Sequence, residues 1–446
     1  MRSRLRVGLM EMLMGLVLAS GSGWSEGDDM KLAQRILADD RLGDVLARSR
    51  SILATGFNAG DGYGEVWIRD FATFIELSCE VYPKEKIKER LLLFFAFQGE
   101  DGNIIDGYIP KEKANVSYQY IQAASQPDYL GHKNTVETDQ ESSLIHGVCL
   151  YIEKTGDRSI LTEVVDGKAV ADRLEWAMEF LMTHRFAAEY GLLWGATTAD
   201  WGDVQPEHEW GVVLDESSHR AIDIYDNALF IVAINDYLAT VKPEADKATK
   251  WTAIRDALKL NVRKHLWDTK RKKFIPHVYL EGSPFSPDLD EDEIYYHGGT
   301  TIAIQADLLN KDEVAHALER MVENVKASGA GSIGLTLYPT YPKGAYKNPS
   351  MALPYSYQNG GDWTWFGGRM IQELVRYNLI EEAYSELGPM LDRVIKYDGF
   401  YEWYTVRNRP KGSGTFRGSA GVLGKAILML QDWAEEHLDE AKKVTP

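Results

Sequence analysis

The connections between helical segments constrain the fold of this 446-residue chain more than any other feature of its sequence. Apolar residues recur at three- and four-residue spacings between helix start and stop signals, a pattern typical of amphipathic helices. It predicts twelve helices, at residues 31–53, 69–82, 85–97, 138–154, 158–185, 222–241, 243–266, 297–309, 311–327, 362–377, 379–396 and 418–435. Short turns follow the second, fourth, sixth, eighth and tenth helices, and the other connections are long: 54–68, 98–137, 186–221, 267–296, 328–361 and 397–417. This alternation places every long loop at the same end of an antiparallel array.

The distribution of charge divides the predicted helices into two sets. Segment 243–266 carries nine charged residues and segment 311–327 carries seven, in the amphipathic patterns of surface helices. Segment 222–241 carries only three, all Asp, and segment 297–309 carries only Asp307, so these helices are expected to be surrounded by others. Six buried helices inside six amphipathic ones predict an all-α fold, the (α/α)6 barrel or six-hairpin toroid, as a single domain over 31–440. An open helical solenoid is the alternative.

Composition excludes several classes of function. The chain has 49 Lys and Arg against 67 Asp and Glu, a net charge of −18, which argues against binding of nucleic acid. Two cysteines, Cys79 and Cys149, lack the spacing of a zinc site or a disulfide framework. No metal or organic cofactor is expected. The acidic stretch 288–293, which lacks the glycine of a calcium loop, is interpreted as a solvated loop or as part of the rim of the pocket. Nothing in the sequence indicates an oligomeric state.

The amino terminus has the order of a secretory signal peptide over residues 1–23. Basic residues precede an apolar run, and small residues follow it. Glu11 interrupts the run, so a secreted or periplasmic location and a cytoplasmic one both stay open. No segment is long enough to predict a membrane span. Asn115-Val116-Ser117 is a glycosylation sequon in a host that modifies such sites.

Polar residues gather where long loops enter the inner helices. Four junctions carry them: Trp67-Ile68-Arg69-Asp70, Glu137-Thr138-Asp139-Gln140-Glu141, Asp226-Asn227 and Gln358-Asn359-Gly360-Gly361-Asp362-Trp363. Helix capping would explain one Asp or Thr at each junction. Four junctions at one pole, with Arg, Gln, Asn and Trp beyond what caps need, favour a polar pocket lined by aromatic rings. Carbohydrate sites have this composition, because hydroxyls take hydrogen bonds and sugar faces stack on indole.

Two loops place a carboxyl among aromatic residues, as hydrolysis of a glycosidic bond requires. Asp200 lies between Ala199 and Trp201, apolar neighbours that would raise its pKa and keep a general acid protonated. Glu402 lies in Phe400-Tyr401-Glu402-Trp403-Tyr404, on the last long loop. For each carboxyl alone, a bond to a loop amide is the competing interpretation. As a pair at one pole, they favour catalysis.

At these residues the chain resembles the six-hairpin glycosidases, and especially the alkaline and neutral invertases. Trp67-Ile68-Arg69-Asp70-Phe71 matches the invertase segment WIRDF, and residues 353–363, LPYSYQNGGDW, are similar to PYSYHNGGSW. Residues 401–404 resemble PEYYDG, whose Glu is the catalytic base, and 419–421 lie where SIAGY would begin. The resemblance implies an inverting mechanism with Glu402 as base. It also implies sugar binding or pocket shaping by Arg69, Asp70, Asp139, Gln140, Gln358, Asn359 and Trp363.

The acid loop departs from the invertase pattern. No segment is similar to their IDRRM-like motif, and residues 194–203 look more like the W-x-S-G-x-D region of the processing-glucosidase and mannosylglycerate-hydrolase branch. That similarity transfers the acid role to Asp200 first, with Asp203 and Asp215 as the other options. Trp67, Trp194 and Asp203 are expected among the residues that bind substrate.

The function predicted from the sequence is therefore an inverting, exo-acting glycoside hydrolase that releases a terminal sugar, with sugar, linkage and anomer undetermined. One alternative is a sugar isomerase or epimerase on the same barrel, for which six histidines supply candidates: His132, His146, His208, His219, His277 and His297. The other is a carbohydrate-binding relative without catalysis.

Overall fold

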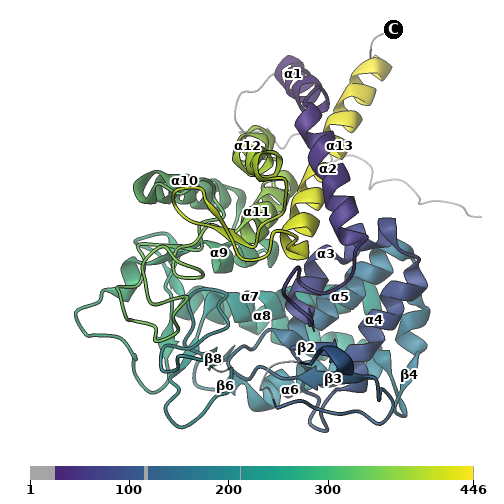
Figure 1. The fold of residues 1–446 in the computed structure, drawn as a ribbon, viewed down its shortest axis with the longest axis vertical. Coiled ribbons are helices and arrows are strands. Elements are labelled where there is room, and N and C mark those ends of the chain that lie inside the picture. The colour runs from purple at the N-terminus through teal and green to yellow at the C-terminus, as the bar shows by residue number, and fades with distance from the viewer. Residues whose placement is uncertain (1–25, 115–118, 211, 445–446) are drawn as a thin grey trace, which may run out of the picture.

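Inner and outer helices alternate along the chain, as the connection lengths predict. The computed structural model describes residues 26–114, 119–210 and 212–444, so the predicted leader at 1–23 and the sequon at 115–117 lie outside it. The inner helices contact one another in sequence order, and the last contacts the first, which closes a ring (Figure 1). They are α3 (Ile68–Val81), α5 (Gln140–Thr155), α7 (Ile224–Asp236), α9 (His297–Gln305), α11 (Thr364–Arg376) and α13 (Arg417–Val444). The chain thus folds as the expected (α/α)6 barrel.

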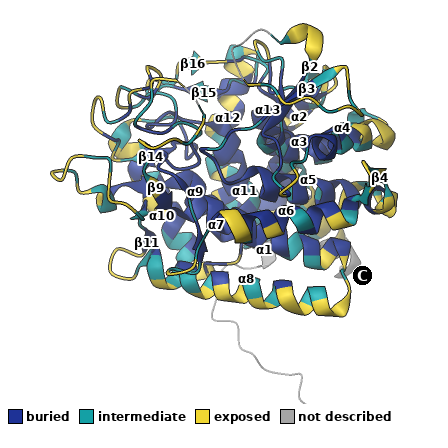
Figure 2. Cartoon of the chain, turned by 90° about the horizontal axis from the view of Figure 1, so that it is seen from below, coloured by how far each residue is buried: buried dark blue, intermediate teal, exposed yellow. Residues whose placement is uncertain are grey.

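An outer helix packs against each inner helix. The outer set is α2 (Asp40–Leu53), α4 (Lys84–Ala96), α6 (Val170–His184), α8 (Ala245–His265), α10 (Lys311–Ser328) and α12 (Ile380–Tyr397). Figure 2 shows exposed stripes along α8, whereas α7 is buried at every position from Ile224 to Ile234. This contrast matches the charge difference between the two segments. No helix in the described part of the chain combines the length and apolar character that a bilayer span requires.

Small residues allow the inner helices to approach one another closely. A Cβ added at Gly421 of α13 would lie 2.3 Å from the Cβ of Phe74 on α3. A Cβ at Gly368 of α11 would lie 2.8 Å from Val422 Cγ2 on α13. Both glycines are therefore required by helix packing, and a larger side chain at either position would push the ring apart.

The helix predicted over 31–53 is two helices, α1 (Glu26–Leu37) and α2. Asp39 has an extended backbone at φ −84° and ψ 97°, and its side chain accepts a hydrogen bond from the Arg41 backbone N–H. The Asp-Asp pair at 39–40 is therefore an N-cap signal that overrides the continuous apolar pattern. α1 packs against the long helix α13, which extends beyond its predicted end.

The helix predicted over 158–185 also begins later than expected. Residues Arg158–Thr162 form a 3₁₀ turn, and β4 (Val164–Val165) pairs with β5 (Lys168–Ala169) before α6 begins. Asp166 and Gly167 both have positive φ, at 45° and 79°. An Asp-Gly pair between β-branched and polar residues is a hairpin signal, and it outweighs the helical spacing here.

The long loops connect to one another through short strands at one pole. One sheet joins the first two loops in the order β1-β2-β3, and another joins the third and fourth in the order β12-β9-β8. Pairs β13-β14 and β15-β16 hold the remaining loops, and β6-β7 and β10-β11 follow α6 and α8. The bounds are β1 (Val66–Trp67), β2 (Gly107–Pro110), β3 (Tyr129–His132), β6 (Phe186–Ala187), β7 (Leu192–Leu193), β8 (Gly195–Ala196), β9 (Arg220–Ile222), β10 (Trp267–Asp268), β11 (Lys273–Phe274), β12 (Val278–Tyr279), β13 (Tyr295–Tyr296), β14 (Leu337–Tyr338), β15 (Trp403–Tyr404) and β16 (Pro410–Lys411). These pairings place side chains from distant loops around one cavity.

Candidate active site

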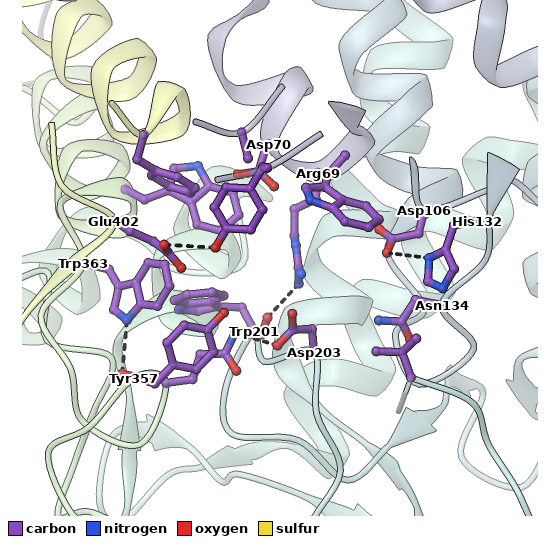
Figure 3. A pocket seen from close by; sticks show the side chains of 17 residues that line it. Arg69, Asp70, Asp106, His132, Asn134, Trp201, Asp203, Tyr357, Trp363 and Glu402 are labelled. Carbon is purple, nitrogen blue, oxygen red and sulfur yellow. Dashed lines mark hydrogen bonds and ion pairs between the residues drawn. The ribbon is translucent and has the colours of Figure 1, made fainter. Parts of the chain in front are cut away.

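A cavity of about 710 Å³, including its open mouth, lies at the long-loop pole. Five of the six long loops or the helix starts that follow them contribute side chains, as Figure 3 shows. The lining includes Glu402, the predicted base. It also includes six residues predicted from sequence to bind substrate: Trp67, Arg69, Asp70, Asp203, Gln358 and Trp363.

Glu402 projects into this cavity from the loop before β15 and is only 4% exposed. Its Oε2 accepts hydrogen bonds from the Tyr63 hydroxyl at 3.0 Å and from the Ser413 backbone N–H at 3.2 Å. Gly412 has φ +69°, and a Cβ there would lie 2.3 Å from Oε2. A glycine at this position therefore allows the 410–413 segment to reach the carboxylate.

Burial raises the pKa of Glu402, and the hydrogen bonds from Ser413 and Tyr63 oppose this effect. The negative charge of Asp203 raises the pKa further. A carboxylate with a raised pKa is a stronger base, while the two donors favour its ionised form.

Asp203 lies across the cavity from Glu402, on the loop between β8 and β9 (Figure 3). The Gln358 side-chain amide donates to Asp203 Oδ1 at 2.9 Å. This bond orients the carboxyl and leaves its second oxygen available for a proton. Gln358 thus positions an acidic group in addition to lining the cavity.

Asp200, the residue expected as the acid, is placed differently. Its Oδ2 and Oδ1 accept the backbone N–H groups of Gly298 and Gly299, each at 2.6 Å, at the start of α9. The side chain is 1% exposed and does not line the 710 Å³ cavity. A Cβ at Gly298 would lie 2.8 Å from Asp200 Oδ2, so the glycine allows this close approach. The structure therefore brings Asp203, and not Asp200, into the cavity, and Asp200 caps a helix.

Asp215, the third option for the acid, lies outside the cavity on an exposed turn. Its Oδ1 accepts from the Ser217 N–H at 2.8 Å and from the Ser217 hydroxyl at 2.7 Å, and Oδ2 lies 3.1 Å from His208 Nε2. These local bonds give the Asp215 carboxylate a structural role in the turn.

Arg69 and Asp70 form the wall at the start of α3. Burial raises the pKa of Asp70 to about 7, the adjacent Arg69 lowers it, and the charges of Glu402 and Asp203 raise it. Arg69 pairs with Glu137 and lies 3.5 Å from Asp139, and its Nη1 donates to the Trp201 carbonyl at 2.8 Å. The guanidinium at this wall is thus already neutralised by carboxylates behind it.

Asp106 and His132 form the far wall and were not predicted as substrate-binding residues. The register of β1, β2 and β3 places Trp67 beside Gly107 and Gly107 beside His132. His132 Nδ1 lies 3.9 Å from Asp106 Oδ2. Burial raises the pKa of Asp106 to about 8 and lowers that of His132 to about 4. Both groups are therefore neutral near pH 7, when they can exchange hydrogen bonds with a ligand without adding charge.

Aromatic rings form the remaining walls. Trp201 stacks on Phe366 with ring centroids 4.7 Å apart, and it meets Trp363 edge-on at 4.8 Å and Trp365 at 5.2 Å. Trp363 in turn donates its indole N–H to the Tyr357 carbonyl at 3.2 Å. These contacts fix the aromatic wall, and the partly buried Tyr63, Trp67 and Tyr357 supply ring surface of the kind on which sugar faces stack.

Four residues predicted to bind substrate lie behind or away from the cavity. Asp139 accepts from the Tyr225 hydroxyl at 3.0 Å, and Gln140 accepts from Lys133 Nζ at 2.8 Å. The Asn359 side chain pairs with the Tyr341 backbone, with its Oδ1 accepting from the N–H at 2.9 Å. Trp194 lies between two guanidinium groups, at 4.8 and 5.0 Å. None of these four residues lines the cavity.

The acidic stretch 288–293 is only partly the solvated loop expected from its sequence. Glu291 accepts hydrogen bonds from the hydroxyls of Tyr279 at 2.7 Å and Tyr341 at 2.6 Å, and it lies 2.9 Å from His277 Nδ1. His277 is accordingly part of a buried network that holds the fourth and fifth loops together.

The family of the chain follows from comparison with known proteins. Residues 41–359 match the glycosyl hydrolase 94 superfamily, catalytic domain, which covers most of the chain. The chain belongs to this superfamily. The match includes Asp203 and ends before Glu402. No curated protein sequence matches the chain significantly.

Solved structures share the fold of this superfamily member at low sequence identity. The GH63 mannosylglycerate hydrolase from Thermus thermophilus, in complex with Tris, aligns with a TM-score of 0.61 at 16% identity, over 85% of this chain and 99% of that one. A rhamnosidase from Klebsiella oxytoca with rhamnose bound aligns with a TM-score of 0.57 at 13% identity, over 87% of this chain and 63% of that one. These matches agree with the barrel and with the expected similarity to mannosylglycerate hydrolase. The closer resemblance to invertases stays a prediction.

Proposed function

We propose that this protein is an inverting, exo-acting glycoside hydrolase that releases a terminal sugar from an oligosaccharide or a small glycoside. In this mechanism Asp203 protonates the glycosidic oxygen and Glu402 deprotonates the attacking water. The observation that carries the proposal is the placement of these two carboxyls in one aromatic-walled cavity, on loops that enter from different sides. Inverting enzymes hold such a pair about 6.5–9.5 Å apart, with room for water.

The base is Glu402 because two donors in its surroundings orient the carboxylate and favour the ionised form. Tyr63 and Ser413 both donate to Oε2. They thereby orient the carboxylate and leave Oε1 to receive the proton of the attacking water. Tyr63 thus acts as a positioning residue for the base.

The acid is Asp203 because it reaches the cavity on a side chain oriented by Gln358. Asp200, three residues earlier, has both oxygens occupied by backbone N–H groups. Burial raises the pKa of Asp200, as its apolar neighbours predict, and the two N–H groups oppose this effect. A proton on Asp200 would weaken one of these bonds, so proton transfer at Asp200 would also disturb the start of α9.

Terminal sugar hydroxyls are expected to bind near Asp70 and Arg69. Asp70 Oδ1 is buried and has no hydrogen-bond partner among the described residues, so a sugar hydroxyl can donate to it. Stacking on the partly buried rings of Trp67 and Tyr357, which line the cavity, would hold the sugar ring at the same time.

The charge of the cavity favours a leaving group without negative charge. Among the described residues, four carboxyl side chains line it, those of Asp70, Asp106, Asp203 and Glu402. Asp106 is neutral near pH 7 and Asp203 is protonated in the proposed mechanism, so Glu402 and the partly ionised Asp70 supply the negative charge. Arg69 is shared by two further carboxylates. A carboxylate or phosphate on the ligand would therefore be repelled, and the lining described here offers it no unpaired cation. The aglycone is expected to be a neutral sugar or polyol, unlike the glycerate named for the mannosylglycerate hydrolase.

Mutation of the two carboxyls tests the mechanism. Glu402→Gln is expected to abolish hydrolysis while sugar binding persists. Asp203→Asn should lose most activity on a natural glycoside and recover it on an aryl glycoside whose leaving group departs without a proton. NMR of the first-formed anomer should show inversion. Asp200→Asn serves as the matched control, and rescue of that variant by the aryl substrate would instead assign the acid to Asp200.

A pair of substrates tests the charge argument separately. A hexosylglycerol and the corresponding hexosylglycerate differ only in the charge of the aglycone. We expect the neutral substrate to have the higher kcat/KM, by at least about tenfold, which corresponds to about 1.4 kcal/mol. Equal or reversed preference would refute the charge argument and leave the assignment of the base and acid untouched.

The same variants distinguish the two alternative functions. A sugar isomerase would retain turnover in Glu402→Gln, and a binding protein would show no turnover in any form. Histidine-based proton transfer is poorly served by this cavity, since His132 is the histidine that lines it and burial lowers its pKa to about 4.

A further inference from the structure

A second cavity lies on the axis of the barrel, away from the long loops. It measures about 470 Å³, including its mouth, and side chains from five inner helices line it: α3, α5, α9, α11 and α13. Inner helices begin at the long-loop pole, and Gln305 is the last residue of α9, so the cavity lies toward the short-turn pole. Most of its lining is polar, including Thr73, Glu76, His146, Gln305, Arg369 and Gln372.

A polar lining at this position is unusual because the centre of an all-helical ring is ordinarily filled by apolar side chains. Three of the ionisable groups around it have partners within the protein. Lys425 Nζ lies 2.6 Å from Glu76, Arg376 Nε lies 2.7 Å from Glu373, and His146 Nδ1 lies 2.6 Å from Asp236. These groups are satisfied without a ligand.

Arg369 is the exception. Its side chain is buried, with the residue only 8% exposed, yet among the described residues no carboxylate lies within 4.0 Å of its guanidinium. Nη2 donates to the neutral Gln305 amide oxygen at 3.2 Å, and the guanidinium lies 5.1 Å from the Phe366 ring. Burial lowers the pKa of Arg369, and the nearby Tyr225, Glu373 and Asp139 oppose this effect only in part. A buried cation that lines a cavity and has no carboxylate in contact indicates that an anionic ligand binds there.

The other lining groups restrict the chemistry of that anion. Glu76 and Glu373 also face the cavity, so a doubly charged phosphate would be repelled, whereas one carboxylate matches the single unpaired guanidinium of the described lining. The amides of Gln305 and Gln372 and the imidazole of His146 can exchange hydrogen bonds with hydroxyl groups. We propose that this axial cavity is a second binding site, for a small hydroxylated monocarboxylate of the sugar-acid class.

The cavity is also connected to the candidate active site. Arg369 interacts with the Tyr225 hydroxyl, which donates to Asp139 Oδ2 at 3.0 Å, and Asp139 lies 3.5 Å from Arg69 in the first cavity. A ligand that neutralises Arg369 changes the charge at one end of this buried chain. Binding at either site is therefore expected to change affinity at the other, by the same factor in both directions.

Calorimetric titration of the full chain with gluconate and with sorbitol tests the proposal. The two probes have similar hydroxylated chains, and only gluconate carries a carboxylate. We expect gluconate to bind at least about tenfold more tightly than sorbitol. Arg369→Gln should remove this preference, and Arg369→Lys should retain part of it. Asp70→Asn, an active-site variant, should leave gluconate binding detectable.

Three results would overturn the proposal. They are equal binding of gluconate and sorbitol, unchanged gluconate binding by a folded Arg369→Gln variant, and loss of gluconate binding in Asp70→Asn. If Arg369→Gln does not fold, a crystal structure of the wild-type protein with gluconate decides the question. A carboxylate on Arg369 would support the proposal, and gluconate only in the long-loop cavity would refute it. None of these measurements depends on hydrolytic activity.

Discussion

Replacement of Tyr63 by Phe tests whether the bond to Glu402 tunes the catalytic base. The change removes one hydroxyl that donates to Oε2 at 3.0 Å and keeps the aromatic ring against the cavity wall. The Ser413 N–H remains as a donor to the same oxygen. The variant therefore perturbs the charge environment of the carboxylate far more than its packing.

The expected magnitude follows from the chemistry of this bond. A hydrogen bond to a charged group contributes about 1.5–3 kcal/mol, and one pKa unit corresponds to about 1.36 kcal/mol. Tyr63 donates to the ionised form and lowers the pKa of Glu402. Its removal should thus raise that pKa by about one to two units. Because the base must be ionised, the acid limb of the kcat/KM profile should move to higher pH by the same amount.

The assay is the pH profile of kcat/KM for wild type and variant on one substrate. Well below the limb, the variant should be about 10- to 100-fold slower, and above it the two enzymes should converge. Tyr384→Phe is a matched control, because Tyr384 donates to Asp39 at the same distance of 3.0 Å, outside the cavity. An unchanged acid limb, or a loss of equal size at every pH, would refute the assignment of Tyr63 and weaken that of Glu402.

Further variants test packing and electrostatics around the site. Gly412→Ala should slow kcat by about 100-fold, because its Cβ would lie 2.3 Å from Glu402 Oε2 and displace it; near-normal kcat would contradict this contact. Burial raises the pKa of Asp106 from 3.8 to about 8. Between these pH values the folded protein keeps a proton that the unfolded chain releases, so the free energy of unfolding should fall as pH rises. The side chain of Asp106→Asn is neutral at every pH, so the Tm of this variant should rise relative to that of wild type between pH 5 and pH 8. The exposed control Asp432→Asn should show no such rise. If the Tm of Asp106→Asn and that of wild type change in parallel with pH, the raised pKa of Asp106 is contradicted. Asp200→Asn should destabilise the fold by about 1–3 kcal/mol, measured by denaturant unfolding, with kcat of the folded protein within about threefold of wild type.

The barrel could be predicted from sequence because loop lengths and charge report directly on topology. Residues 224–234 of α7 carry one charged side chain, Asp226, and are all buried. This prediction needs no knowledge of distant contacts. The errors came from local signals that compete with helical spacing. Asp39 ends a helix through its own side chain, and Asp166-Gly167 forms a hairpin through positive φ. Both signals are present in the sequence and were outweighed there by the apolar pattern.

The site was harder to predict because several carboxyls lie close together in the sequence. Asp200 and Asp203 share one aromatic loop, and composition gives Asp200 the more apolar neighbours. Which of the two is occupied by backbone N–H groups depends on α9, a distant helix. Nothing in the sequence around Asp106 indicates a place in the cavity, apart from its position before a short apolar strand. Asp106 reaches the cavity wall only because β2 pairs with β1 and β3.

The bond between Asp200 and the start of α9 makes the acid loop observable in solution. The first N–H groups of a helix have no intrahelical acceptor, so they ordinarily exchange with solvent deuterium without protection. Here the amides of Gly298 and Gly299 are held by a side chain from the loop that carries Asp203. The hydrogen-exchange rates of these two amides should therefore report opening of that loop separately from unfolding of the helix. The measurement needs neither a mutation nor an attached probe.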